Sequence, residues 1–128
     1  MMLIYSRMAE NLTQKMKNII SGKITVSGTA TITSANTSAD MGSIYIADSG
    51  TSTVVRLEIT GGTVENTSTT TGCAVYCAAT ASGTAVNISG GTVKKSGTNT
   101  SGYAVYATNS GKINITSGAT ITGRKFNC

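Results

Sequence analysis

Proline, histidine and tryptophan are absent from this 128-residue chain, and charged residues make up only 12% of it. The absence of histidine excludes a Ser-His-Asp or Cys-His catalytic site within the chain, and it also excludes zinc held by imidazole. The carboxylate side chains are Glu10, Asp40, Asp48, Glu58 and Glu65. They are scattered, whereas glycoside hydrolysis or calcium binding needs several carboxylates close together. We therefore expect a non-catalytic protein with no cofactor and no bound metal.

Long apolar runs are missing as well. No stretch approaches the roughly 20 apolar residues of a membrane-spanning helix, so we expect no membrane span. The apolar start, Met1 to Ile4, is too short for a signal peptide. The chain ends at Cys128 with no obvious closing element, which is compatible with truncation at one or both ends.

The chain is basic, with ten lysines and arginines against five acids and a net charge of +5. The simplest interpretation is a charge that keeps the protein soluble. The alternative is weak attraction to an anionic cell-wall polymer or an acidic extracellular glycan. Nucleic acid is not an expected partner, because no basic stripe with interleaved aromatics is present.

The three cysteines are Cys73, Cys77 and Cys128. On a strand, Cys73 and Cys77 would share a face but lie about 13 Å apart, which is too far for a disulfide. We expect buried free thiols that pack as small apolar groups. A Cys-x3-Cys metal site would lack a third nearby ligand.

Two short phrases recur along the chain with one common period. The first reads LEITGGTV at 57–64 and VNISGGTV at 86–93, with looser copies at 24–32 and 113–121. The second reads GSIYI at 42–46, GCAVYC at 72–77 and GYAVYA at 102–107. Both phrases repeat about every 30 residues, the distance from Tyr76 to Tyr106. Two phrases that keep one period indicate a repeat architecture.

Each repeat contains short strands with period-two alternation, a Gly-Gly corner and a polar loop. Because similar strands recur about 30 residues apart, we expect them to stack in parallel as a β-solenoid. Three columns of aliphatic side chains are then expected to face inward. They are Ile24, Leu57, Val86 and Ile113; Val26, Ile59, Ile88 and Ile115; and Ile32, Val64, Val93 and Ile121.

Tyr45, Tyr76 and Tyr106 are the candidate ligand-binding residues, which we call the tyrosine column. If the neighbouring aliphatic residues face inward, these rings face outward and stack about 4.8 Å apart. The opposite arrangement, with alanine and tyrosine inside, stays open. Outward rings could stack on the sugars of an extended glycan, or they could simply stabilise adjacent coils.

Residues 6–20 differ from the repeats. Met8, Leu12, Met16 and Ile19/Ile20 recur at helical spacing. Because the end of a solenoid needs a cap, we expect residues 1–20 to form a short amphipathic helical cap on repeats that span 21–128. A helix lying on a membrane surface is the alternative.

The ISGGTV and GxAVY phrases resemble right-handed parallel β-helix repeats of large bacterial surface and secreted proteins, the pectate-lyase-like superfold. The resemblance covers about residues 21–123 and implies an all-β, single-stranded parallel β-helix with about 30 residues per coil. Members include polysaccharide lyases, glycoside hydrolases, adhesins and repeat stalks, so fold alone does not select an activity. We expect a structural or adhesive repeat outside the cell or on its surface. A carbohydrate-binding module is the alternative, and a fragment of a polysaccharide lyase or hydrolase is a minor one.

Overall fold

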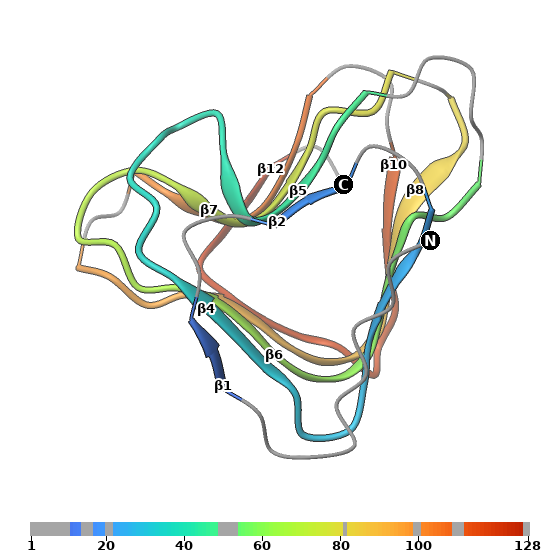
Figure 1. Cartoon of the computed structure of the whole chain (residues 1–128), viewed down its shortest axis with the longest axis horizontal. Coiled ribbons are helices and arrows are strands. Elements are labelled where there is room, and N and C mark those ends of the chain that lie inside the picture. Colours follow the sequence, from blue (N-terminus) through green and yellow to red (C-terminus); the bar gives the residue numbers. More distant parts are fainter. Residues whose placement is uncertain are drawn as a thin grey trace.

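The computed structural model of the chain describes residues 11–13, 17–19, 22–48, 54–80, 82–98, 101–108 and 112–126. Every regular element in these residues is a β-strand, and none of them is a helix. The prediction of an all-β chain is therefore confirmed. Viewed down the shortest axis, the strands outline three sides of a triangle, and successive parts of the chain are stacked along the line of view (Figure 1).

The strands form two sheets in which every pairing is parallel. One sheet follows the order β1-β4-β6-β8-β10, with β3 paired to β6 and β11 paired to β8, and the other follows β12-β9-β7-β5-β2. The bounds are β1 Asn11–Thr13, β2 Lys17–Ile19, β3 Ile24–Val26, β4 Thr31–Ser34, β5 Gly42–Ile46, β6 Leu57–Asn66, β7 Cys73–Cys77, β8 Thr84–Lys95, β9 Tyr103–Ala107, β10 Lys112–Ile115, β11 Thr120–Thr122 and β12 Arg124–Phe126.

We call segments 24–46, 57–77, 84–107 and 112–126 rows 1 to 4. Each row pairs with the next, and equivalent residues lie opposite one another. Ile59, for example, is in register with Val26 on one side and with Ile88 on the other. The three aliphatic columns expected from the sequence are all found in these registers. The repeated phrases therefore specify which residues become neighbours.

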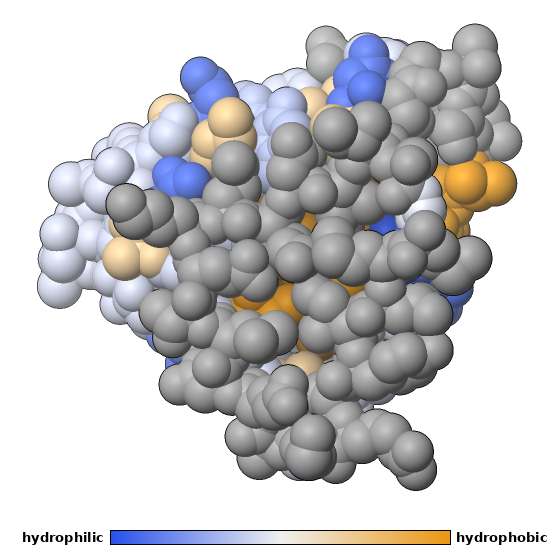
Figure 2. All heavy atoms as spheres, in the orientation of Figure 1, coloured by the Kyte–Doolittle hydropathy of each residue, from blue (hydrophilic) through white to orange (hydrophobic). Residues whose placement is uncertain are grey.

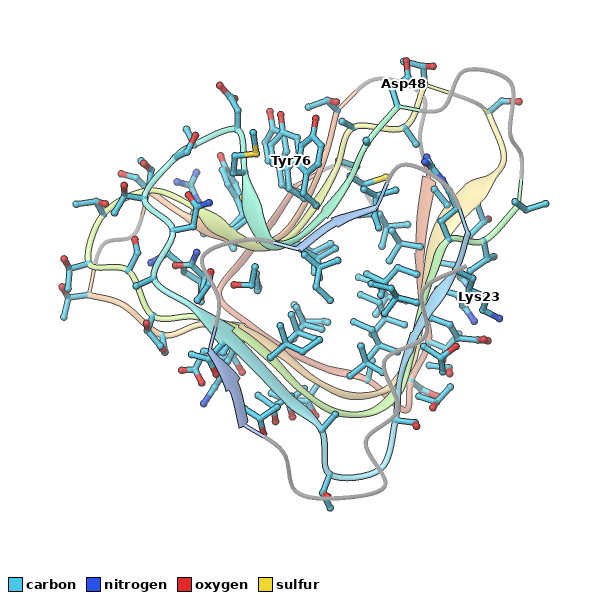
Figure 3. The ribbon with its side chains drawn as sticks, viewed as in Figure 1. Lys23, Asp48 and Tyr76 are labelled. Carbon is cyan, nitrogen blue, oxygen red and sulfur yellow. The ribbon has the colours of Figure 1, made fainter. Side chains whose placement is uncertain are left out.

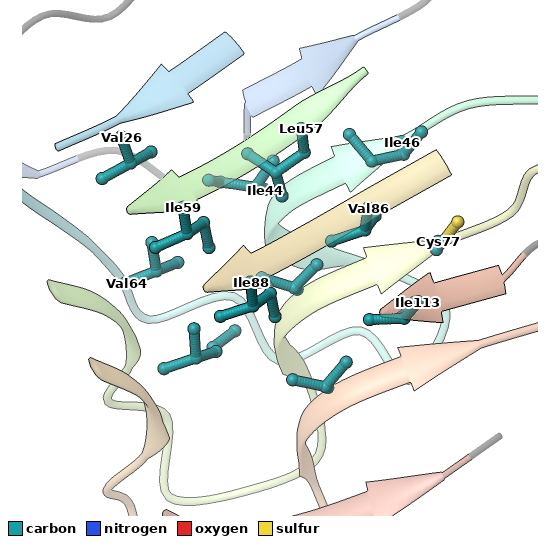
Figure 4. Packing of buried hydrophobic residues seen from close by; sticks show 14 of the residues in the cluster. Val26, Ile44, Ile46, Leu57, Ile59, Val64, Cys77, Val86, Ile88 and Ile113 are labelled. Atoms are coloured by element: carbon teal, nitrogen blue, oxygen red, sulfur yellow. The ribbon is translucent and has the colours of Figure 1, made fainter. Parts of the chain in front are cut away.

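The aliphatic columns fill the space between the sheets (Figures 3 and 4). Leu57, Ile59, Val86 and Ile88 have no exposed surface. Full burial of one such side chain stabilises the fold by roughly 1.5–3 kcal/mol relative to an exposed one. In the space-filling view, apolar surface is visible near the middle of the molecule (Figure 2). In row 4, Ile115 and Ile121 pack against this core but are only partly buried.

The Gly-Gly corners let β6 and β8 bend and serve two sides of the triangle. Gly62 and Gly91 have φ angles of 76° and 73°, a region that side chains disfavour. A Cβ on Gly62 would lie 2.5 Å from the carbonyl oxygen of Ala30 in the row below. Glycine is therefore required at Gly62 by conformation and by the close approach of two rows.

The predicted N-terminal helix is wrong where the structure describes that segment. Asn11–Thr13 form β1, which pairs with β4, and Lys17–Ile19 form β2, which pairs with β5. Of the expected apolar stripe, Leu12 and Ile19 thus lie in strands. The other members of the stripe lie outside the described residues: Met8, Met16 and Ile20.

The physical reason is the unpaired backbone at the edge of row 1. The outer edges of β4 and β5 present N–H and C=O groups that a parallel strand satisfies directly. An isolated helix of this length is only marginally stable in water. The segments 11–13 and 17–19 therefore extend the two sheets instead of forming turns of a helix.

Candidate functional site

The tyrosine column is built by three parallel strands of the smaller sheet. Tyr45 of β5 is in register with Tyr76 of β7, and Tyr76 is in register with Tyr106 of β9. The backbone register continues to Asn18 of β2 at one end and to Phe126 of β12 at the other. The column thus exists because the Ala-Val-Tyr phrase returns at the same position of each row.

The rings of the tyrosine column stack face to face. The centroids of Tyr45 and Tyr76 are 5.5 Å apart with planes inclined by 17°, and those of Tyr76 and Tyr106 are 5.2 Å apart and inclined by 20°. Both faces of the Tyr76 ring are therefore covered by neighbouring rings, and this residue is only 6% exposed. Tyr45 and Tyr106 are partly buried.

The column lies on the face of the smaller sheet that points away from the aliphatic core. Ile44, Val75 and Val105 belong to the core cluster, whereas the three tyrosines do not. Figure 3 shows the Tyr76 side chain pointing away from the enclosed interior. Ala74 and Ala104 are nevertheless fully buried. The outer face of β7 and β9 is thus covered at Ala74 and Ala104, two positions before the outward-pointing Tyr76 and Tyr106.

Two further groups extend the column beyond Tyr106, Tyr103 of row 3 and Arg124 of row 4. The Tyr103 ring lies 5.1 Å from the Tyr106 ring and is tilted by 53°. The guanidinium carbon of Arg124 lies 4.8 Å from the centroid of Tyr103. An arginine over an aromatic face is an attractive cation–π contact. The aromatic cluster therefore ends on a cation, a feature that the period of the repeats did not indicate.

Burial raises the pKa of Tyr76 to about 12, with a smaller contribution from the negative charge of Asp40. Tyr76 is therefore a neutral phenol at physiological pH. It can donate a hydrogen bond at its edge, but it is a poor general base or nucleophile. Tyr76 consequently offers a hydroxyl group for hydrogen bonding rather than a catalytic base.

Cys73 and Cys77 are buried free thiols, as the sequence predicted. Burial raises the pKa of Cys73 to about 11, and burial also raises the pKa of Cys77. A thiol with a raised pKa forms little of the reactive thiolate. These side chains therefore act as packing groups, while Cys128 lies outside the described residues.

Three of the carboxylates are held in contacts that are separate from one another. Glu58 lies 2.5 Å from the ammonium of Lys23, and Glu65 lies 3.2 Å from that of Lys94. Asp48 accepts hydrogen bonds from the hydroxyl and the backbone N–H of Thr80, at 2.6 and 3.2 Å. Among the described residues, no group of three or more acids or cysteines could hold a metal ion.

Sequence reasoning missed a buried polar column at the ends of β4, β6 and β8. Ser34, Asn66 and Lys95 occupy equivalent positions and are 1%, 0% and 7% exposed. The amide of Asn66 donates to the Asn36 carbonyl at 2.9 Å and accepts from the Ser68 N–H at 2.9 Å. The period-two alternation was a usable signal, because each residue lies two positions after an inward aliphatic side chain.

Lys95 is the charged member of this polar column. Its ammonium donates to the Ser68 carbonyl, and burial lowers the pKa of the group. Its stem packs so closely against Gly102 that a Cβ there would lie 2.4 Å from Cε of Lys95. The polar column therefore anchors the loops between the sheets and forms no open site.

Arg56 is a second buried cation that the sequence did not indicate. It is 2% exposed, and its Nη1 donates to the Ala47 carbonyl at 2.6 Å. This bond ties the end of row 1 to the start of row 2. No motif marks the position, because the equivalent residue in row 3 is Ala85.

No protein-family model matches the chain, and no curated protein or solved structure matches it either. In the part of the chain that is described, no helix is long and apolar enough to cross a membrane.

Proposed function

We propose that the chain is a right-handed, single-stranded parallel β-helix that serves as a non-catalytic structural or adhesive repeat, displayed on a cell surface or secreted. The row-on-row register of equivalent residues carries this proposal. The chain passes back and forth between the two sheets, with β3 and β4 together, and β10 and β11 together, in the place of one strand, as expected for continuous winding. Parallel strands joined by a crossover are right-handed in about 98% of cases, which supports the hand.

The covered faces of the tyrosine column support a structural role. Sugars bind aromatic residues by packing their apolar C–H faces on an exposed ring. The Tyr76 ring instead has a tyrosine on each face, at 5.5 and 5.2 Å. Aromatic pairs of this kind contribute roughly 0.5–1.5 kcal/mol each beyond the area that they bury. The main role of the column in this proposal is therefore to stabilise the packing of rows 1, 2 and 3 against one another.

The second candidate function is a carbohydrate-binding module whose repeats resemble those of the pectate-lyase-like superfold. The observation that favours it is the partial exposure of Tyr45 and Tyr106, which leaves ring edges and hydroxyl groups along the winding axis. The ligand in this case is an extended extracellular glycan or an anionic cell-wall polymer, since the chain carries a net charge of +5.

The test compares the wild-type protein with Tyr76→Ala and Tyr76→Phe on a glycan array and in urea unfolding. We expect none of the three proteins to bind a glycan. Tyr76→Ala lowers the free energy of unfolding by about 3 kcal/mol, because a ring that is buried between two others is removed. Tyr76→Phe keeps the ring stack and changes stability by less than about 1 kcal/mol.

The binding function would be supported instead if the wild-type protein bound a glycan and Tyr76→Phe lost that binding while remaining folded. Surface display is tested separately by antibody labelling of intact cells that carry the protein. Labelling only after the cells are permeabilised contradicts the proposed location.

A further inference from the structure

We propose that the tyrosine column is a site of oxidative cross-linking, at which a one-electron oxidant joins Tyr76 covalently to Tyr106 or to Tyr45. The product is a carbon–carbon bond between two phenol rings of adjacent rows. Such a bond would add a covalent link between rows whose described contacts are noncovalent. This inference goes beyond the structural role proposed above.

The geometry places the reacting groups in contact before any reaction occurs. Tyr76 has one phenol ring 5.2 Å away and another 5.5 Å away, and both are nearly parallel to it. The parallel pairing of β5, β7 and β9 keeps the backbones of the three tyrosines in register. Effective molarities of held groups reach about 10⁵ M or more in favourable cases, so coupling within one chain is expected to exceed coupling between chains.

The chemistry balances with two electrons. Each of two neighbouring phenols loses one electron and one proton and becomes a phenoxyl radical. The radicals join through the ring carbons next to the hydroxyl-bearing carbons. The hydrogen on each of those carbons then moves to the phenolic oxygen and restores both aromatic rings. Hydrogen peroxide acting with a peroxidase takes up the two electrons and two protons and is reduced to water.

The surroundings of the column favour coupling between rows. Tyr76 is 6% exposed, which protects a radical on this ring from competing reactions in solvent. Tyr45 and Tyr106 are partly buried and so give a small oxidant access to the column. Tyr103 lies 5.1 Å from Tyr106 but on the same strand, so a bond between these two would not join rows.

The full-length protein is oxidised with photo-excited ruthenium tris-bipyridine and persulfate, a small one-electron oxidant system, and is then unfolded so that its buried thiols can be alkylated. Trypsin then separates the tyrosines into different peptides: 24–56 with Tyr45, 57–94 with Tyr76 and 96–112 with Tyr103 and Tyr106. Mass spectrometry is expected to find peptide 57–94 joined to 96–112 or to 24–56, with the loss of two hydrogens.

An equal mixture of ¹⁴N- and ¹⁵N-labelled protein distinguishes coupling within one chain from coupling between chains. We expect the joined peptides to carry a single label. Tyr76→Phe keeps the ring stack and is the matched variant. In this variant, peptide 57–94 should no longer be joined to 96–112 or to 24–56, whereas a bond between Tyr103 and Tyr106 within peptide 96–112 can still form.

Three results overturn the proposal: joined peptides that carry both labels as often as random coupling between chains predicts, bonds that involve only Tyr5 of peptide 1–7, or unchanged joining in Tyr76→Phe. A folded Tyr76→Phe protein, verified by circular dichroism, ensures that the loss of joining reports the missing phenol.

Discussion

At Gly62 and Gly91 the backbones of adjacent rows approach so closely that a methyl group has no room. A Cβ on Gly91 would lie 2.7 Å from the carbonyl carbon of Gly61, and the φ angle of Gly91 is 73°. Two independent penalties therefore coincide at one residue: a left-handed backbone conformation and contact with a main chain that cannot move aside.

Gly91→Ala is expected to lower the free energy of unfolding by about 2 kcal/mol or more, because both penalties apply. Urea unfolding measures the change. Thr92→Ala is the control, since Thr92 follows directly, lies opposite Thr63 and is partly exposed. It should cost less than about 1 kcal/mol. Equal losses in the two variants would show that the corner has no special requirement for glycine.

Buried polar residues are limited by their need for hydrogen-bond partners, whereas the glycines are limited by space and backbone conformation. Asn66 is fully buried but has partners for both its amide and its carbonyl oxygen. A satisfied polar group stabilises a loop, whereas an unsatisfied one would cost about 1–3 kcal/mol. The neighbouring loops are thus held by hydrogen bonds that the Ser34 and Asn66 side chains accept from backbone N–H groups and that Lys95 donates to a backbone carbonyl.

At the scale of the strand, the column of Val26, Ile59, Ile88 and Ile115 is the unit of stability. An interior member touches apolar neighbours in the rows above and below it. A member in row 4 is less enclosed, because Ile115 is only partly buried. The same side chain therefore contributes different amounts in different rows.

Ile88→Ala should lower the free energy of unfolding by about 2–5 kcal/mol, and Ile88→Val by about 1 kcal/mol. Ile115→Ala, made in the same column, should cost less than half as much as Ile88→Ala because its site is partly exposed. Urea unfolding of the three variants provides the comparison. A larger loss at Ile115 than at Ile88 would contradict the order of burial.

The outer face of the same strands carries a second, polar column. Lys23 forms an ion pair with Glu58, and the amide of Asn114 donates to the oxygen of Asn87 at 2.8 Å. A hydrogen bond from Lys23 is the main cause that lowers the pKa of Glu58; the charge of Lys23 and a hydrogen bond from Asn87 add to it, while desolvation opposes them. Polar residues thus link rows 1 to 4 outside the core.

The Lys23–Glu58 pair of this column predicts that the free energy of unfolding depends on pH in the acidic range. Because the pKa of Glu58 in the fold lies below 4.5, its contribution is complete above about pH 4.5 and is lost as the pH falls through the lowered value. The contribution at pH 7 is about 0.5 kcal/mol, since Lys23 and Glu58 are 40% and 29% exposed. The measurement is the difference in unfolding free energy between wild type and Glu58→Gln.

That difference should shrink between pH 5 and pH 3, because wild type then carries a neutral side chain as well. Repetition at 1 M salt should reduce it at pH 7 through screening. A difference that stays constant with pH would show that the Lys23–Glu58 pair has no energetic effect.

At the scale of the whole molecule, the two sheets enclose one aliphatic interior that includes Cys77, and Cys73 is buried beside it. The reactivity of both thiols therefore measures how often the fold opens and exposes them. Their raised pKa values, about 11 for Cys73, also slow any reaction that requires the thiolate.

In a Cys128→Ser background, Cys73 and Cys77 should react with a thiol reagent at pH 8 only as fast as the protein opens. The rate should rise by several orders of magnitude in unfolding concentrations of urea. Absorbance of the released chromophore follows the reaction. Rapid labelling of both thiols in the absence of urea would contradict the buried arrangement.

Much of the register was predictable because the repeats encode it directly. Ile59 and Ile88 occur at the same place in two copies of one phrase, so stacking the phrases makes these residues neighbours. The tyrosine column was predictable for the same reason. Whether Tyr76 presents a ring face was not predictable, because the separation and tilt of adjacent rings depend on the packing of three strands.

The N-terminal segment shows where a local pattern fails. Leu12 and Ile19 fit a helical stripe, yet both belong to strands that pair with row 1. Propensity along a short segment is a weak preference, and an adjacent sheet edge supplies hydrogen bonds that outweigh it. A sequence pattern has no information on which edges the remainder of the chain leaves open.

The amino-acid sequence by itself thus determined the strand alternation, the period of about 30 residues, the aliphatic columns and the glycine corners, since these follow from side-chain size and spacing along the chain. Only the tertiary structure decided that segments 11–13 and 17–19 are strands, that Lys95 and Arg56 are buried, and that the tyrosine rings cover one another. These features depend on distances between residues far apart in the chain, which local spacing does not specify.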